Sequence, residues 1–178
     1  RKKNDSEISA PHQLTLTATP IPRTLSMSVY ANMDVSVIDE LPPGRKPIQT
    51  SCLPLNGKTQ LIERILAATN NGSKAYWICP LIEESENLDL NAVMETYEDL
   101  KEYFSEENVG CLHGKLSPKE KQRQIQKFKD SETSVLVSTT VVEVGVDIPD
   151  ADIMVIENAE RFGLAQLHQL RGRIGRGS

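Results

Sequence analysis

Four short apolar runs, separated by stretches of helical periodicity, constrain the fold of this chain more than any other feature. They are "AYWICPLI" from Ala75, "NVGCLHG" from Asn108, "SVLVST" from Ser134 and "IMVIEN" from Ile153. Continuous apolar runs of this length are typical of strands that are covered on both faces of a parallel sheet. The alternation of strand and helix therefore predicts an α/β fold with a parallel β-sheet and helices on both faces.

Three segments between or before these runs have the pattern of helices. "KTQLIERILAATNNG" ends at a glycine, and "LNAVMETYEDLKEYF" places its apolar and aromatic residues on one helical face. In "SPKEKQRQIQKF" Ser117 is placed to cap the helix, Pro118 takes its first position and Glu120 can close a capping box. The start of this third helix is the most sharply predicted boundary in the chain.

The first fifty residues have a different character. "QLTLTATP" (13–20) predicts a strand and "RTLSMSVYANM" a short helix, and this pair cannot close a domain. Pro42, Pro43, Gly44 and Pro47 then indicate a connector between packed units. We therefore predict two parts: residues 1–49, the end of one domain plus a linker, and residues 50–178, a second domain.

Composition excludes several classes of protein. No apolar run approaches the roughly 20 residues of a membrane helix, and without a signal-peptide pattern we expect a cytoplasmic protein. The three cysteines and three histidines show no metal-ligand spacing, so we expect no metal held by protein side chains and no disulfide framework. The formal net charge is −5, yet "RGRIGRG" (171–177), here called the arginine segment, is purely basic.

Two stretches resemble parts of a nucleotide site and are rejected on their context. "NGKT" (56–59) lacks the first glycine of a phosphate loop, because Cys52 stands in its place. "IMVIEN" ends in Glu157 like a metal-binding strand, but without a phosphate loop that acid has no partner. We therefore expect Glu157 to be structural.

Ligands of parallel sheets collect beyond the carboxyl ends of the strands. "HGKLS", "STTVVEVGVD" and the arginine segment are therefore expected to lie at that edge. In the arginine segment, Arg173 and Arg176 flank Gly175, so both guanidinium groups could converge on one phosphate. The alternative is a solvated basic tail.

Three stretches carry a resemblance to a known family. "LTATPIPRT" (16–24), "VLVSTTVVEVGVDIPDAD" (135–152) and "QLHQLRGRIGRG" (166–177) occur in the order of motifs III, V and VI of superfamily 2 helicases. "TATPIPRTL", "ELPPGRKPI", "CPLIEESENLDL" and "LHGKLSPKEK" resemble the RecG branch in particular. The resemblance implies that residues 50–178 are the second RecA-like motor domain, preceded by a strand-helix remnant of the first. It also implies that ATP with Mg²⁺ is held mainly by that first domain.

The resemblance also assigns roles to individual residues. Arg173 and Arg176 resemble arginine fingers, with Gln169 beside them, and Gly145 and Asp147 resemble motif V residues that face the nucleotide. On the nucleic-acid side, the similar positions are Gly114 and Thr139 for the DNA backbone and Thr17 and Thr19 for coupling. Without the resemblance, Asp147 reads equally well as a turn residue and Thr19 as a helix cap.

The function implied is that of an ATP-dependent DNA helicase that remodels branched DNA in recombination and repair. Its partners would be branched DNA, ATP, and the first RecA-like domain and DNA-binding wedge domain of the same protein, with no membrane. This piece alone would be inactive. The alternatives are an Mfd-like transcription-repair coupling translocase and a non-enzymatic domain that binds polyanions.

Overall fold

The computed structural model describes residues 47–80, 86–139 and 151–175, together with Leu14, Leu16, residues 36–38 and Glu40. The fold divides the chain into two units, one ending at Val37 and the other beginning at Ile38. Every helix and strand among the described residues belongs to the second unit. Of the strand and helix expected within residues 13–33, only Leu14 and Leu16 are described, and neither is in a helix or strand; the rest lies outside the described residues. The boundary near residue 50 stays a prediction.

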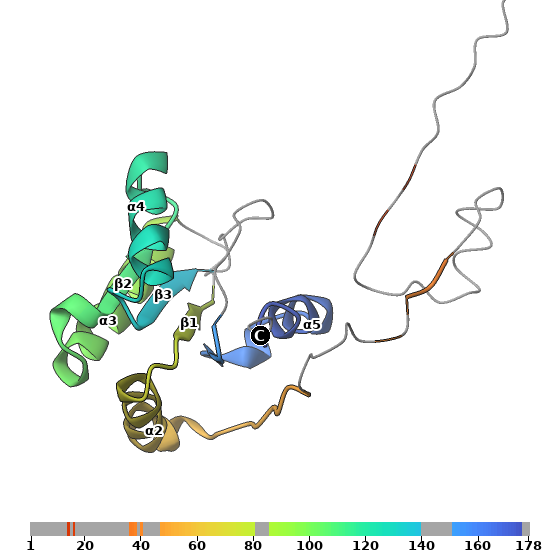
Figure 1. Cartoon of the computed structure of the whole chain (residues 1–178), viewed down its shortest axis with the longest axis horizontal. Helices are drawn as coiled ribbons and strands as arrows, with labels where there is room; N and C mark the ends of the chain where they lie inside the picture. The colour runs from red at the N-terminus through yellow and green to blue at the C-terminus, as the bar shows by residue number, and fades with distance from the viewer. Residues whose placement is uncertain are drawn as a thin grey trace, which may run out of the picture. The chain divides into compact units, whose positions relative to one another are not determined.

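A four-stranded parallel sheet forms the centre of the second unit (Figure 1). Its strands are β1 (Ala75–Cys79), β2 (Val109–Leu112), β3 (Val135–Thr139) and β4 (Ile153–Ile156), in the order β2-β3-β1-β4. All four predicted apolar runs are therefore confirmed as strands. The register aligns Ala75 with both Val135 and Ile153, so the strands begin level with one another.

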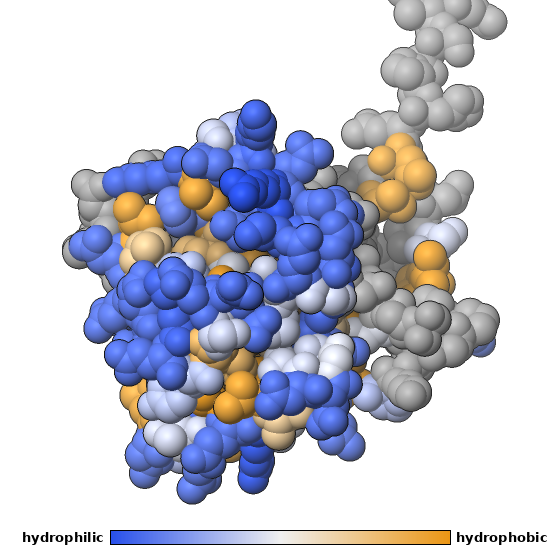
Figure 2. Space-filling model, turned by 60° about the vertical axis from the view of Figure 1, so that its left-hand side comes forward, coloured by the Kyte–Doolittle hydropathy of each residue, from blue (hydrophilic) through white to orange (hydrophobic). Residues whose placement is uncertain are grey.

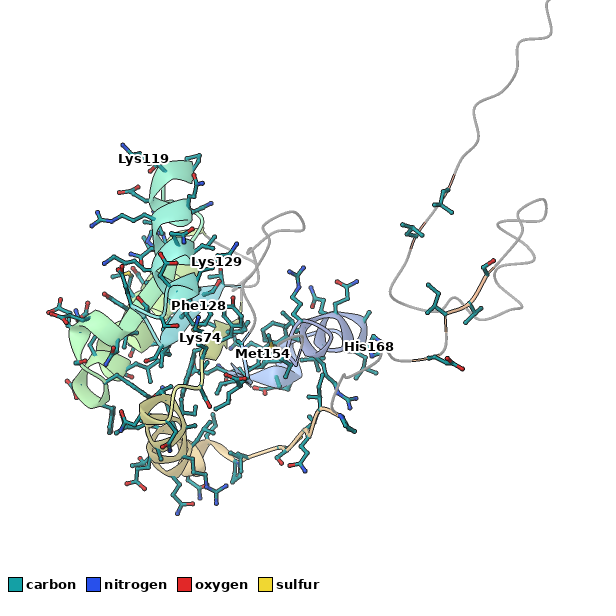
Figure 3. The ribbon with its side chains drawn as sticks, in the orientation of Figure 1. Lys74, Lys119, Phe128, Lys129, Met154 and His168 are labelled. Atoms are coloured by element: carbon teal, nitrogen blue, oxygen red, sulfur yellow. The ribbon has the colours of Figure 1, made fainter. Side chains whose placement is uncertain are left out.

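Helices cover both faces of this sheet. Alternate residues of β1 point to opposite sides, so Trp77 packs with α2 (Lys58–Asn70) and α3 (Glu86–Tyr103), whereas Tyr76 packs with α4 (Pro118–Lys129). The side of α4 also carries α5 (Leu164–Arg171), with Met154 of β4 in the same cluster (Figure 3). The predicted α/β architecture with helices on both faces is confirmed.

The start of α4 follows its predicted capping chemistry. Ser117 has extended backbone angles, and its hydroxyl accepts a hydrogen bond from the amide of Glu120. The Glu120 carboxylate accepts one in return from the amide of Ser117, and Pro118 takes the first helical position. The reciprocal bonds satisfy two amides that a helix end otherwise leaves unpaired.

No helix is predicted over Leu164–Arg171, because the glycines that follow favour a loop, yet α5 forms there. Leu164, Leu167 and Leu170 recur every three residues, a spacing that indicates one face of a helix. Leu167 and Leu170 pack against the core, while Leu164 is 87% exposed. Arg171 consequently belongs to the last turn of a helix and not to a loop.

The amino ends of the strands are closed by side chains from several elements. Lys74, just before β1, donates a hydrogen bond from its ammonium to the carbonyl of Lys129 and lies over the ring of Phe128 (Figure 3). Its backbone amide donates to Asp152 just before β4. Lys74 therefore ties the amino ends of β1 and β4 to the end of α4.

The surface of the described part is mostly polar. On the face shown in Figure 2, hydrophobic residues occur in small separate groups among hydrophilic ones. Among the described residues, no helix combines the length and the apolar character that spanning a membrane requires.

Candidate functional site

Two of the predicted site residues meet at the carboxyl edge of the sheet. Leu112 and Ser138 are register partners on β2 and β3, so Gly114, two residues beyond the first, lies near Thr139, directly after the second. Gly114 is exposed and Thr139 is only 4% exposed. A ligand could thus reach the backbone of Gly114 directly, whereas contact with the Thr139 hydroxyl requires that neighbouring groups move aside.

Gly114 has no structural reason to be glycine in this part of the chain. A β-carbon added there would meet no atom within 4 Å, and its φ is outside the left-handed region that favours glycine. Glycine in such an open position allows another molecule to approach the backbone closely. Gly114 is therefore well placed for contact with a ligand at the sheet edge.

The surroundings of Gly114 are electropositive. Burial lowers the pKa of the preceding His113, and the nearby charge of Lys121 lowers it further. Lys115 also contributes to that lowering, against the opposing effect of Glu120. Although the chain is acidic overall, the ammonium groups of Lys121 and Lys115 therefore lie near this corner, which suits an anion.

At the other side of the same edge, Glu157 is held by three elements. Its carboxylate lies 3.0 Å from the ammonium of Lys58 at the start of α2, and it accepts a hydrogen bond of 3.3 Å from Thr96 of α3. The thiol of Cys79 lies 3.9 Å away, and burial raises the pKa of that thiol to about 12. Glu157 is thus structural as expected, but the expectation that it lacks a partner is wrong.

The described part of the arginine segment, residues 171–175, does not lie at the carboxyl edge. The amide of Gly175 is hydrogen bonded to the carbonyl of Ala151, just before β4 begins, and Ile174 is buried beside Ala151 in the core. For these described residues the expectation of a place at the same edge as Gly114 is therefore wrong. The reason is topological: α5 returns antiparallel to β4, so whatever follows α5 arrives at the amino end of that strand.

Residues 171–175, at the amino end of β4, form a second surface besides the one around Gly114. Arg173 is partly buried on this second surface. Within the described part of the chain its guanidinium makes no ion pair. Gln169 is exposed one turn earlier on α5. A planar guanidinium in this state is suited to bind an anion supplied by another molecule.

The remaining predicted site residues, Arg176, Gly145, Asp147, Thr17 and Thr19, lie outside the described residues. The predicted convergence of Arg173 and Arg176 on one phosphate therefore stays a prediction. Sequence reasoning missed Lys58 and left Arg171 without a role. The guanidinium of Arg171 donates a 3.2 Å hydrogen bond to the carbonyl of Ile48, a pairing across 123 residues that no local pattern reveals.

The described residues offer no metal site of their own. No group of three or more His, Cys, Asp or Glu side chains among them could hold an ion. Of the residues assigned to a nucleotide, only Arg173 and Gln169 are described, and a guanidinium is a fitting partner for a phosphate but not for Mg²⁺.

Comparison with known proteins shows the family to which the chain belongs. The helicase conserved C-terminal domain matches residues 57–178, more than half of the chain. The ATP-dependent DNA helicase RecG of Escherichia coli (strain K12) is 57% identical over 169 residues, which are 94% of this chain and 24% of that relative. RecG of Haemophilus influenzae (strain ATCC 51907 / DSM 11121 / KW20 / Rd) is 52% identical over 178 residues, 99% of this chain and 26% of the relative.

The chain thus spans about a quarter of the length of these relatives. Among solved structures, the DUF1998 helicase MrfA bound to DNA superposes with a TM-score of 0.51 at 20% identity, covering 67% of this chain and 16% of that one. At this identity the likeness shows the fold alone. The predicted resemblance to RecG-type sequences and the RecA-like fold are both confirmed.

Proposed function

The chain belongs to the helicase conserved C-terminal domain family, and we propose that it is the second motor domain of a RecG-type ATP-dependent DNA helicase. In this proposal the complete protein remodels branched DNA such as stalled forks and four-way junctions, in the cytoplasm. Its first RecA-like domain and a DNA-binding wedge domain supply what this chain lacks. ATP with Mg²⁺, held mainly by the first domain, supplies the phosphoryl group that is transferred to water.

The arginine segment contributes charge to that reaction. Arg173, with Arg176 and Gln169, reaches across the interdomain cleft and neutralises negative charge that develops on the phosphoryl oxygens. Gly145 and Asp147 face the same nucleotide. Arg173 is a partly buried residue whose guanidinium makes no ion pair with any described residue, which supports this role because an arriving phosphate could pair with it.

The carboxyl edge holds DNA in the proposal. Main-chain amides at Gly114 and the hydroxyl of Thr139 contact the phosphate backbone of one strand, while Thr17 and Thr19 link nucleotide state to this grip. Backbone contacts carry no sequence information, which suits a motor that must move over any base. The open space around Gly114 and the positive charge beside it support this assignment.

The observation that carries the proposal is the placement of these two surfaces at opposite ends of the same parallel sheet, one beyond β2 and the other before β4. Gly114 follows the carboxyl end of β2, whereas Gly175 is bonded to Ala151 before the amino end of β4. A rigid sheet between them means that a shift of one surface is passed to the other. This is what a motor needs in order to turn nucleotide closure into movement along DNA.

The test uses a protein that carries this chain together with an ATP-binding motor domain. We expect Arg173→Ala and Arg176→Ala each to lower the DNA-stimulated ATPase rate by at least about 100-fold with ATP binding kept. Arg161→Ala, a change at an exposed arginine on a neighbouring turn, is the matched control and should leave the rate unchanged. Full activity in the Arg173 and Arg176 variants would refute the finger assignment.

Gly114→Ala tests the other surface. We expect it to weaken DNA stimulation while leaving the DNA-independent rate unchanged, because only the approach of a strand is obstructed. A non-enzymatic domain that binds polyanions would show no ATPase rate to lose in any variant. An Mfd-like translocase would instead show no preference for branched over linear duplex DNA.

A further inference from the structure

Residues 47–50 belong to the second unit and form no helix or strand. No backbone hydrogen bond among the described residues, outside helices and strands, involves these four positions. Their attachment comes from Ile48, whose carbonyl accepts the hydrogen bond from Arg171 and whose half-buried side chain joins the core on the α5 side. This stretch is the end of the segment that the sequence assigns to an interdomain linker.

The same isoleucine touches the arginine segment. A β-carbon added at Gly175 would stand 3.6 Å from Cγ1 of Ile48, so this side chain lies in van der Waals reach of the glycine. Gly175 has a φ of +69°, a conformation that only glycine adopts without strain. Ile48 therefore contacts one residue on each side of Arg173 in the sequence: Arg171, two positions before it, and Gly175, two positions after it.

From these contacts we propose that Arg171 is a positioning residue, which fixes the linker at Ile48 against the arginine segment and thereby sets where Arg173 lies. The inference rests on the proposed function, because it gives Arg171 its effect through an arginine finger. A linker that shifts when two motor domains close pulls on the carbonyl of Ile48. Since Arg171 and Gly175 bracket Arg173, that pull moves the finger.

Helix stability alone does not explain this arginine. A basic residue in the last turn of a helix stabilises the helix by interacting with the negative end of its dipole, and this needs no particular hydrogen-bond partner. Here the guanidinium instead reaches a carbonyl 123 residues away. The contact contributes a specific link between the two segments in addition to any general effect on α5.

The experiment compares steady-state ATP hydrolysis in a protein that carries this chain and an ATP-binding motor domain. Arg171→Ala should lower kcat by about tenfold to a hundredfold, with KM for ATP within twofold of wild type, because a misplaced finger weakens the transition state and not ground-state binding. Ile48→Ala should act in the same direction. Arg171→Lys should recover most of kcat, since an ammonium can donate to the same carbonyl.

Hydrogen exchange of the 178-residue chain supplies a readout that does not depend on activity. The amides of residues 172–175 should exchange faster in Arg171→Ala than in wild type, while those of β1 and β3 stay equally protected. Arg161→Ala is the control in both measurements and should behave as wild type. Unchanged exchange at 172–175, or a rise in KM with kcat kept, would overturn the proposal.

The variant Arg173→Ala separates the two levels of inference. If it loses activity while Arg171→Ala keeps full kcat, the positioning role is wrong and the finger stands. If Arg173→Ala keeps full activity, the proposed function fails, and the exchange measurement still decides whether Arg171 holds the linker to the arginine segment.

Discussion

The ammonium of Lys58 lies 3.0 Å from the carboxylate of Glu157, which joins the start of α2 to the end of β4. Each residue belongs to a stretch that resembles half of a nucleotide site, "NGKT" and "IMVIEN". In the fold Lys58 and Thr59 are the first residues of α2, and a 3-10 turn at Leu55–Gly57 comes before them in place of a strand, so "NGKT" cannot form a phosphate loop. The two residues instead form an ion pair with each other, which, together with the hydrogen bond from Thr96, holds the end of β4 against α2 and α3.

Removing Glu157 should destabilise the domain. Its side chain is 20% exposed and that of Lys58 39%, so solvent screens the pair only in part. We expect Glu157→Ala to lower the free energy of unfolding by about 1–2 kcal/mol, because Thr96 loses the carboxylate to which it donates and Lys58 loses the nearer of two carboxylates, with Asp99 left at 3.7 Å. Urea denaturation measures this. Glu98→Ala, at a carboxylate that is 60% exposed, should cause no measurable loss.

The same pair predicts the alkaline limit of stability. Burial lowers the pKa of Lys58, but the hydrogen bond and charge of Glu157 and the charge of Asp99 outweigh it, so the net pKa is raised above 10.5. A raised pKa in the folded state contributes stability that is fully present below pH 10.5 and is lost as the pH rises through the folded value. Denaturation midpoints should therefore fall above pH 10.5, and less so in Lys58→Met. An equal fall in both proteins would contradict this origin.

The cysteines should differ sharply in reactivity. Cys52 is exposed, whereas Cys79 and Cys111 are buried, and burial raises the pKa of each of these two thiols to about 12. Because the thiolate is the reactive form, one thiol per chain should react with a disulfide reagent at pH 8 in the native protein, and three after denaturation. Rapid reaction of more than one native thiol would show that the sheet opens.

Sequence patterns were sufficient for the parts of this fold that are set by local chemistry. Apolar runs gave the four strands, and Ser117 with Glu120 gave the start of α4 to the residue. The contacts between Lys58 and Glu157 and between Arg171 and Ile48 join residues about 100 and 123 positions apart, which no local rule reaches. The arginine segment was expected at the wrong edge of the sheet because α5 was not predicted. This helix returns the chain to the amino end of β4 before residues 172–175 begin.

Replacement by alanine should destabilise the domain at Gly110 of β2 but not at Gly114, which follows the same strand. A β-carbon at Gly110 would stand 2.9 Å from Cδ1 of the fully buried Leu136 and 3.2 Å from Cγ2 of Thr133. Gly110→Ala should therefore cost about 1–3 kcal/mol by overpacking. Gly114→Ala meets open space and should change stability by less than about 0.5 kcal/mol. Thermal denaturation of the two variants side by side measures the contrast, and equal losses would contradict the packing around β2.

The capping box at α4 should make stability depend on acid. Hydrogen bonds from the hydroxyl and the amide of Ser117 lower the pKa of Glu120 below its usual 4.5. Its contribution is therefore present above pH 4.5 and is lost as the pH falls through the folded value.

Ser117→Ala should cost about 1 kcal/mol at neutral pH, since the Glu120 amide loses its acceptor. It should also flatten the acid dependence, because Glu120 then loses the hydroxyl that accounts for the largest part of its pKa shift. Denaturation midpoints of wild type and Ser117→Ala between pH 7 and pH 3 test both effects, and parallel curves would show that the box is not formed in solution.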